Sequence, residues 1–147
     1  MEILLRKIQQ SDYEKGFPEL LSQLTSIGNI DQDLFYKYIQ NVNHNKNHHV
    51  YVFHDLDLDK IIGTGTIIII NKFIHSSNNL AIIEDVVIHK LCRGQHLGKD
   101  MITKLINTAN DNFCYKIILN CDNQNIDFYK KIGFKNGENS MVKYLLH

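Results

Sequence analysis

Apolar residues alternate or run continuously in several segments of the chain, and each such segment predicts a β-strand. The predicted strands cover residues 3–8, 50–56, 61–70, 81–89 and 115–121. Apolar residues recur at every third or fourth position elsewhere, and this spacing predicts helices over residues 12–24, 31–42, 98–112 and 126–132. Residues 134–146 are predicted to form a final hairpin that turns at Asn136-Gly137.

This order of elements predicts an α/β (α+β) fold with a central, mixed and mostly antiparallel sheet flanked by helices. The length favours one domain over residues 1–147. Pro18 lies inside the first helical segment, so that helix is expected to break or to start late. The run at residues 67–70 is apolar on both faces, as in the central strand of a sheet.

The strand at 81–89 and the helix at 98–112 are joined by a basic turn, residues 93–99. A strand, a glycine-bearing turn and a helix N-terminus together form an anion site, because unpaired N–H groups and the positive end of the helix dipole point to one place. The turn has neither the glycine spacing of a dinucleotide-binding loop nor the spacing and Ser or Thr of a Walker loop. A helix cap with a basic flank is the alternative.

Composition narrows the function classes further. Sixteen basic and sixteen acidic residues cancel, so no overall charge indicates nucleic acid or a membrane surface. Cys92, Cys114 and Cys121 form no CxxC motif and leave an odd thiol, which favours a reducing cytoplasm. No apolar run is long enough to span a membrane, and the first residues do not resemble a signal peptide. The histidine-rich segment 44–49 has no Cys or acid at ligand spacing, so no metal site is expected.

Several stretches together resemble the GNAT acetyltransferases and, among them, the glucosamine-6-phosphate N-acetyltransferases. The turn RGQHLG at Arg93 resembles the family's pyrophosphate loop, Q/R-x-x-G-x-G/A, with His96 in place of its first glycine. The narrower resemblance rests on five further stretches in the family's order: LTSIGNI at Leu24, KFIH at Lys72, IEDVVI at Ile83, CYKIIL at Cys114 and NIDFYKKIGF at Asn125. It covers most of the chain and implies a GNAT fold whose fourth and fifth strands splay apart.

This resemblance implies transfer of the acetyl group of acetyl-CoA to the amine of glucosamine 6-phosphate, a step of UDP-N-acetylglucosamine biosynthesis. Acetyl-CoA is then the co-substrate, with no metal, no nucleic acid and no membrane span. The resemblance also implies a cytoplasmic homodimer with active sites at the interface, in which the last strand crosses to the partner. Residues matched to coenzyme binding are Val86, Val87, Ile88, Arg93, Gly94, Gln95, His96, Leu97, Gly98, Lys99, Asn125, Phe128, Tyr129 and Lys131. The loop is expected to work with His96 if that position needs no positive φ, because backbone N–H groups hold the coenzyme.

Three positions are matched to catalysis. Tyr129 resembles the family's general acid for the departing thiolate, and a core tyrosine is the alternative. Asp85 lies beside Glu84 in mid-strand; the two acids are expected to face opposite sides of the sheet and to hold the sugar, or else to form an ion pair. Asn120 stands where relatives carry an acid, and since Asn cannot act as a base its contact is expected to be through the backbone. Asn125 is expected to cap the helix that carries Tyr129.

The residues matched to substrate binding lie in the same stretches and near the C-terminus. They are Thr25, Lys72, Phe73, Ile74, His75, Glu84, Asp85, Tyr115, Lys116, Lys143 and Tyr144. Tyr144 stands where the family has an Arg, so either Lys143 replaces that Arg or the phosphate loses one contact.

Other functions stay open at this point. One is a GNAT enzyme for another amine, such as a peptide N-terminus or a polyamine, and another is a CoA-binding module without catalysis. Cys121 as a covalent acetyl carrier is disfavoured, because no His base is near it in the sequence.

Overall fold

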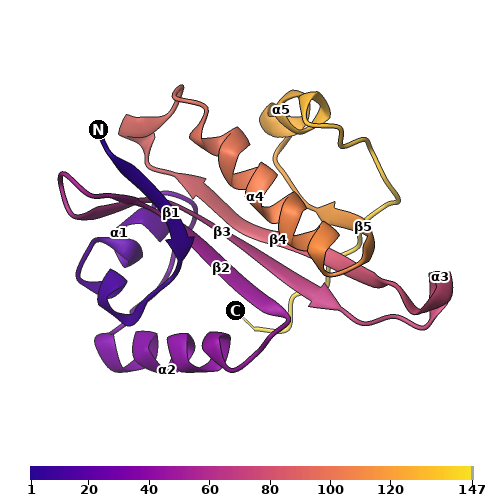
Figure 1. Cartoon of the computed structure of the whole chain (residues 1–147), viewed down its shortest axis with the longest axis horizontal. Helices are drawn as coiled ribbons and strands as arrows, with labels where there is room; N and C mark the ends of the chain where they lie inside the picture. The colour runs from indigo at the N-terminus through magenta and orange to yellow at the C-terminus, as the bar shows by residue number, and fades with distance from the viewer. Residues whose placement is uncertain (147) are drawn as a thin grey trace.

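A five-stranded sheet forms the centre of the computed structural model, which describes residues 1–146 (Figure 1). Its strands lie side by side in chain order. They are β1 (Ile3–Lys7), β2 (His48–Asp55), β3 (Lys60–Ile70), β4 (Asn79–Ile88) and β5 (Cys114–Leu119). Each lies where the apolar pattern predicts a strand.

The strand pairing confirms a mixed, mostly antiparallel sheet. β1 to β4 pair antiparallel, and β5 joins β4 in parallel. The pairing of β4 with β5 ends at Ile83 and Leu119, whereas β4 continues beside β3 as far as Ile88. The two strands therefore separate along the second half of β4, as the predicted splay requires.

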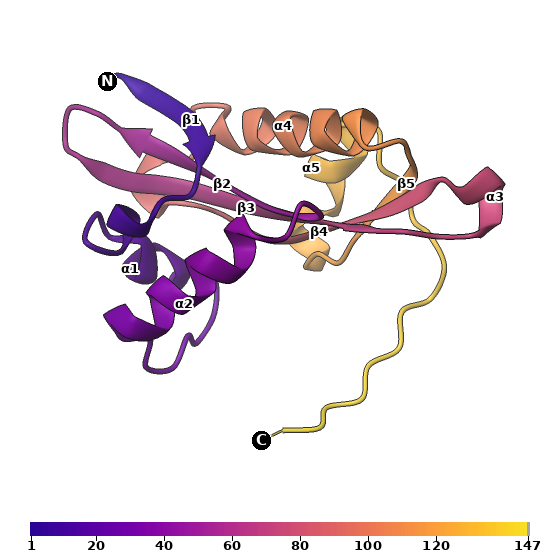
Figure 2. The ribbon, with the colours of Figure 1, turned by 60° about the horizontal axis from the view of Figure 1, so that its bottom comes forward.

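Helices cover both faces of this sheet (Figure 2). α4 (Leu97–Asp111) lies on one face, and α1 (Phe17–Leu21) and α2 (Gln32–Asn43) lie on the other. The shorter elements are η1 (Gln10–Tyr13), α3 (Ile74–Ser77), η2 (Lys90–Cys92), η3 (Asn123–Asn125) and α5 (Ile126–Lys131). The predicted first helix is broken: Gly16 adopts a φ of 89° between η1 and α1, and Pro18 lies in the first turn of α1.

Two apolar clusters hold these layers together. Beneath α4, the side chains of Met101, Ile102 and Leu105 are fully buried against the sheet. Burial of one such side chain stabilises a fold by roughly 1.5–3 kcal/mol. Gly65 on β3 permits this close packing, because a Cβ there would lie 2.8 Å from Met101 Cγ. The second cluster joins α1 and α2 to the opposite face.

The segment after α5 differs from its prediction. Among residues 1–146 no strand follows β5, so the hairpin predicted at 134–146 is wrong. The backbone instead runs as a tail away from the sheet (Figure 2). Met141 and Leu146 in this tail are 95% and 90% exposed. A strand-like sequence becomes a strand only when its N–H and C=O groups pair with another edge, and the tail pairs with none within residues 1–146.

Candidate active site

β4 carries a β-bulge at its two acids. Its pairing with β3 shifts between Thr64 and Thr66, which leaves Asp85 and Val86 opposite the single residue Gly65. Asp85 has a φ of 52°, in the left-handed region. The expectation that Glu84 and Asp85 face opposite sides assumed regular alternation, and the bulge interrupts that alternation at this point.

Asp85 in the bulge and Glu84 before it are both exposed, and neither belongs to an ion pair within residues 1–146. The ion-pair alternative is therefore absent from this part of the chain, and the carboxylates are free to bind a ligand. The charge of Asp85 also reaches α2, because burial and then this charge raise the pKa of Tyr38 above its ordinary value. The sequence analysis did not connect Tyr38 with Asp85, since its helical spacing placed it on the apolar face of α2.

The second half of β4 has an open edge toward β5. Beyond Ile83, β5 no longer pairs with it. Val87 is buried in the core, and Val86 and Ile88 pack partly buried against the cluster beneath α4. Unpaired backbone N–H groups on such an edge can donate to the carbonyl of a ligand. This is the edge where Val86, Val87 and Ile88 are predicted to contact the coenzyme.

The start of α4 has the unpaired N–H groups that the predicted anion site requires. The first helical hydrogen bond is donated by the Asp100 N–H to the carbonyl of His96, at 3.0 Å. The N–H groups of Leu97, Gly98 and Lys99 precede it, and no hydrogen bond within residues 1–146 gives them an acceptor. These groups and the positive end of the helix dipole converge on one place outside the helix.

The loop was expected to work with His96 if that position needs no positive φ, and this condition is not met. It is the N-cap residue of α4 and has a φ of 63°, so this position does require left-handed backbone. That conformation costs a non-glycine residue about 1–2 kcal/mol, although His is enriched among the residues that adopt it. Gly94, with a φ of 86°, makes the preceding turn. The Nε of Arg93 donates to the Ile88 carbonyl at 3.2 Å, which ties the loop to the end of β4.

Leu97 and Gly98 fix how α4 begins. The Leu97 side chain is buried in the core, so only its backbone is available to a ligand. Gly98 lies in the first turn of the helix, where an added Cβ would meet Phe128 Cζ at 3.4 Å. Gly98 therefore allows the start of α4 to lie close to α5. Gln95 and Lys99 are exposed beside this contact.

Tyr129 on α5 is half-buried and stays protonated. Its ring lies edge-on to Phe128 and Phe134, with centroids 5.0 Å and 5.7 Å away. Burial, and then the charge of nearby Cys121, raise its pKa above the ordinary tyrosine value. A phenol that keeps its proton at neutral pH can act as a hydrogen-bond donor or a general acid.

For Asn120, Asn125 and Lys131, the part of the chain that the structure describes shows no contact that supports the predicted role. The side chain of Asn125 makes no capping hydrogen bond, so its predicted cap is wrong. The physical reason is its helical backbone, φ −101° and ψ −3°, whereas an N-cap side chain reaches the next turn from an extended backbone. Asn120 and Lys131 are exposed, and their roles stay predictions.

α3 and the start of β5 come together. The ring of His75 stacks on Tyr115 with centroids 4.2 Å apart, and Lys116 Nζ lies 5.7 Å from the centroid of the same ring. Lys72, Phe73 and Ile74 lead directly into His75. Residues 75–77 are three consecutive non-glycine residues with positive φ, between 52° and 63°. Backbone strain of this kind is common at functional sites.

The remaining predicted substrate residues lie apart from this cluster. Thr25 follows α1, which lies at the opposite end of the sheet from α3 (Figure 1). Lys143 and Tyr144 lie on the exposed tail. A single chain therefore brings together residues 72–75 with 115–116, but not the whole predicted substrate set.

Among residues 1–146, no three His, Cys, Asp or Glu side chains are grouped so that they could hold a metal. Nor is any helix in this part of the chain long and apolar enough to cross a membrane.

Comparison with known protein families identifies the family to which this chain belongs. The sequence model of the Acetyltransferase (GNAT) family matches residues 4–134. The chain belongs to the GNAT acetyltransferase family. Enzymes of this family use acetyl-CoA, and the anion site at α4 together with the open edge of β4 fits that coenzyme.

Among its GNAT relatives, the chain is similar to glucosamine 6-phosphate N-acetyltransferases. It is 36% identical to that of Arabidopsis thaliana over 95% of each chain. It is 33% identical to that of Candida albicans over 93% of this chain and 92% of the other. The crystal structure of the Arabidopsis enzyme matches with a TM-score of 0.93 and 34% identity, over 98% of this chain and 99% of that one. The resemblance read from the motifs is confirmed.

Proposed function

We propose that this protein transfers the acetyl group of acetyl-CoA to the amine of glucosamine 6-phosphate, giving N-acetylglucosamine 6-phosphate and CoA. The observation that carries the proposal is similarity along nearly the whole chain to relatives named for this reaction. The site geometry supports it: an anion-binding helix start and an open strand edge lie next to a bulge with two free carboxylates.

We call the open edge of β4, residues 93–99 and α5 the coenzyme side. The N–H groups of Leu97 to Lys99 bind the pyrophosphate, with Arg93 and Lys99 adding positive charge. The β4 edge at residues 86–88 donates to the acetyl carbonyl and the pantetheine arm. Phe128, Asn125 and Lys131 line the far wall of this groove on and beside α5.

We call the bulge, residues 72–77, residues 115–116, Thr25 and the tail the acceptor side. Glu84 and Asp85 hold the sugar hydroxyls and the amine, because carboxylates accept strong hydrogen bonds from both. Lys72, His75 and Lys116 bind the phosphate. The stack of His75 on Tyr115 holds the imidazole in place.

The reaction needs no acyl-enzyme. The neutral amine attacks the acetyl carbonyl, and the N–H groups of β4 stabilise the negative charge that develops on its oxygen. When the carbon–sulfur bond breaks, Tyr129 donates its proton to the departing thiolate and regains one that the amine has lost. Holding both substrates in attack geometry contributes on the order of 7–11 kcal/mol in favourable intramolecular systems.

We further propose a homodimer in which the tails are exchanged. Exposed apolar side chains concentrate in the tail: Met141, Val142, Tyr144, Leu145 and Leu146. A tail that pairs with the outer edge of β5 in a second copy satisfies its backbone and buries these side chains. It also brings Lys143 and Tyr144 toward the acceptor side, which a single chain leaves incomplete.

Two further predictions belong to this proposal: acetyl-CoA is used without a metal, and the enzyme acts in the cytoplasm. Cys92, Cys114 and Cys121 are all free thiols, which supports a reducing compartment.

The test measures CoA release from acetyl-CoA with four acceptors: glucosamine 6-phosphate, glucosamine, spermidine and a short peptide. Glucosamine 6-phosphate should react far faster than glucosamine, because the cations of the acceptor side bind only the phosphorylated sugar strongly. Equal rates on the two sugars would contradict the substrate assignment. Faster reaction of spermidine or the peptide would favour another amine, and acetyl-CoA binding without turnover would favour a CoA-binding module.

A further inference from the structure

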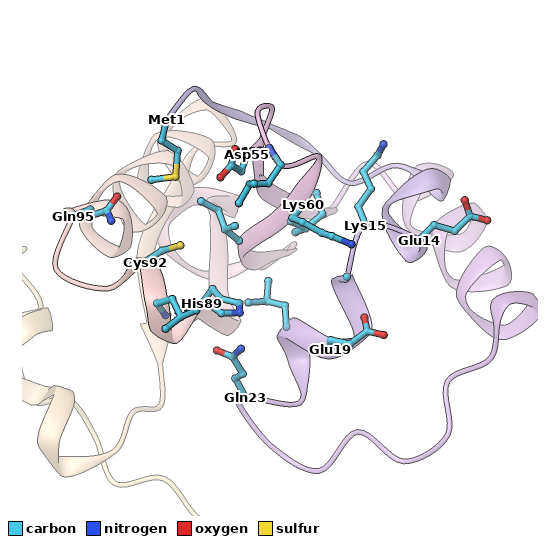
Figure 3. Close-up of a pocket in the computed structure, with 16 residues that line it drawn as sticks. Met1, Glu14, Lys15, Glu19, Gln23, Asp55, Lys60, His89, Cys92 and Gln95 are labelled. Atoms are coloured by element: carbon cyan, nitrogen blue, oxygen red, sulfur yellow. Dashed lines mark hydrogen bonds between the residues drawn. The ribbon is translucent and has the colours of Figure 1, made fainter.

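A cavity of about 620 Å³ opens between α1, the β2–β3 hairpin and the segment around η2 (Figure 3). Its lining includes Glu19 of α1, Asp55 and Lys60 of the hairpin, and His89 and Cys92 beside η2. None of these residues belongs to the acceptor side, and Gln95 is its one lining residue within the 93–99 loop. The cavity therefore meets the groove proposed for acetyl transfer only at Gln95.

Much of the cavity wall is apolar. Leu20 and Ile61 are buried core residues that also line it. Leu91 lines it from the η2 side and is 79% exposed. An apolar body placed here removes these side chains from water, which stabilises a complex by roughly 25 cal/mol for each Å² buried.

Asp55 is the unusual group in this cavity. Asp55 is only 1% exposed, yet it lines the cavity. Figure 3 shows it among Met1, Cys92 and Lys60. Its Oδ1 accepts from the N–H groups of Asp57 and Leu58, at 3.0 Å and 3.1 Å. No hydrogen bond or ion pair within residues 1–146 involves its Oδ2. Asp55 lines the cavity, so a ligand placed there can donate to this oxygen in place of water.

The basic groups that line this cavity form no ion pair with Asp55 within residues 1–146; the N-terminal ammonium of Met1 lies 3.9 Å from Asp57 Oδ2 instead. Lys15 is paired with Asp59 at 3.0 Å. Lys60 stands directly across the hairpin from Asp55, but it is exposed and forms no ion pair in the described chain. The charge of Asp55 extends into the cavity, since burial and then this charge raise the pKa of the Cys92 thiol. Glu14 and Glu19 add negative charge to the rim.

We propose that this cavity is a second ligand site, which takes a small molecule with a protonated amine bound to Asp55 Oδ2 and an apolar body lying on Leu20, Ile61 and Leu91. An ammonium group offers three donors and no acceptor, which suits a carboxylate whose second oxygen is free. The proposal does not depend on the acetyl-transfer function, because its ligand contacts other residues.

The probe is phenethylamine, whose binding is measured by calorimetry and by shifts of backbone amide NMR signals. Phenethyl alcohol is the matched neutral control. The amine should bind at least tenfold more tightly than the alcohol, as expected for a charge-assisted hydrogen bond. Its shifts should concentrate at α1, the β2–β3 hairpin and η2. Equal affinities, or shifts confined to the bulge and α3, overturn the proposal.

Asp55→Asn tests the carboxylate while it preserves Oδ1 for the two turn N–H groups, and it should weaken amine binding at least tenfold. Asp85→Asn is the matched control, because it removes the carboxylate of the proposed acceptor side and should leave phenethylamine binding unchanged. Unchanged binding in Asp55→Asn, or loss of binding in Asp85→Asn, overturns the proposal.

Leu91→Trp keeps the proposal testable if Asp55→Asn does not fold. Leu91 is exposed, so the change leaves the core intact, and the added ring fills the cavity. Binding of the amine and of the alcohol should both fall. Unchanged binding of the amine places it elsewhere and overturns the assignment.

Discussion

The coenzyme side and the acceptor side of this protein are built in different ways. The proposed coenzyme side lies within one chain: β4 has an open edge, and the 93–99 loop leads into a helix start whose N–H groups lack acceptors within residues 1–146. The acceptor side gathers residues from distant segments, and two of its members lie on a tail that leaves the sheet. Nucleotide-like coenzymes can be bound by local backbone geometry, whereas selection of one amine needs side chains that only the folded assembly brings together.

Removal of the tail after Ser140 is expected to have the largest effect. The acceptor side should lose its partner residues and the protein its dimer, so acetyl transfer should disappear. Acetyl-CoA binding should survive, because the coenzyme side lies within one chain. Size-exclusion chromatography, a CoA-release assay and calorimetry with acetyl-CoA measure the three properties. A truncated monomer with full activity would show that the acceptor side does not need the tail of a partner chain.

Tyr129→Phe should lower kcat by roughly 10²-fold if the phenol protonates the thiolate. The Kd for acetyl-CoA should change little, because the ring and its contacts with Phe128 and Phe134 remain. Steady-state rates at saturation, with chemistry rate-limiting, measure this effect. An unchanged kcat would remove Tyr129 from catalysis and leave it as a packing residue.

The pH profile sharpens the same prediction. The raised pKa of Tyr129 means that its phenol is protonated, and active as an acid, to a higher pH than an ordinary tyrosine. Activity that depends on this proton should therefore fall only above about pH 10, the ordinary tyrosine value. Tyr129→Phe should lack this alkaline limb, and its persistence in the variant would assign it to another group.

Gly98→Val should weaken acetyl-CoA binding by about tenfold or more, since overpacking typically costs 1–3 kcal/mol. The added branches push against Phe128 and displace the start of α4 from α5. Gly98→Ala is the control, because one Cβ at 3.4 Å from Phe128 is an ordinary contact and should be tolerated within a few-fold. Calorimetry compares the two, and equal affinities would show that the coenzyme does not depend on this contact.

Tyr115→Leu should raise the KM for glucosamine 6-phosphate by roughly two- to tenfold, the range expected when an aromatic pair is lost. The KM for acetyl-CoA should stay constant, because His75 and Tyr115 lie outside the coenzyme side. Phe113→Leu, a neighbouring exposed aromatic residue outside any aromatic pair described here, is the control. A rise in both KM values would mean that the two sides are not independent.

His96→Gly should have the smallest effect. Glycine relieves the left-handed backbone of the N-cap but adds freedom to the unfolded chain, worth roughly 0.5–1 kcal/mol, so the two effects offset each other. The Kd for acetyl-CoA should stay within a few-fold, since backbone N–H groups hold the phosphates. A loss of tenfold or more would show that the imidazole itself binds the coenzyme.

The local sequence pattern was sufficient to predict the secondary-structure elements. The apolar spacing predicted the strands and most helices, and the sequence at residues 81–112 predicted the strand, turn and helix start that the structure shows there. The helices depend on hydrogen bonds between residues close in the chain, and the buried faces of both helices and strands can be read from the spacing of their apolar residues.

The remaining features depend on tertiary structure, because the local sequence of a short segment does not determine backbone twist or long-range strand pairing. The bulge at Asp85 exists because β3 and β4 shift register around Gly65, which must stay small beneath Met101. The left-handed backbone at His96, with a φ of 63° at the N-cap of α4, could not be read from the residue type, because most histidines have negative φ. Tyr38, an apolar-face residue by spacing, lies near Asp85 only after α2 packs on the sheet. The tail has the pattern of a strand but pairs with no edge in the described part of the chain, residues 1–146, and a strand forms only beside a partner strand.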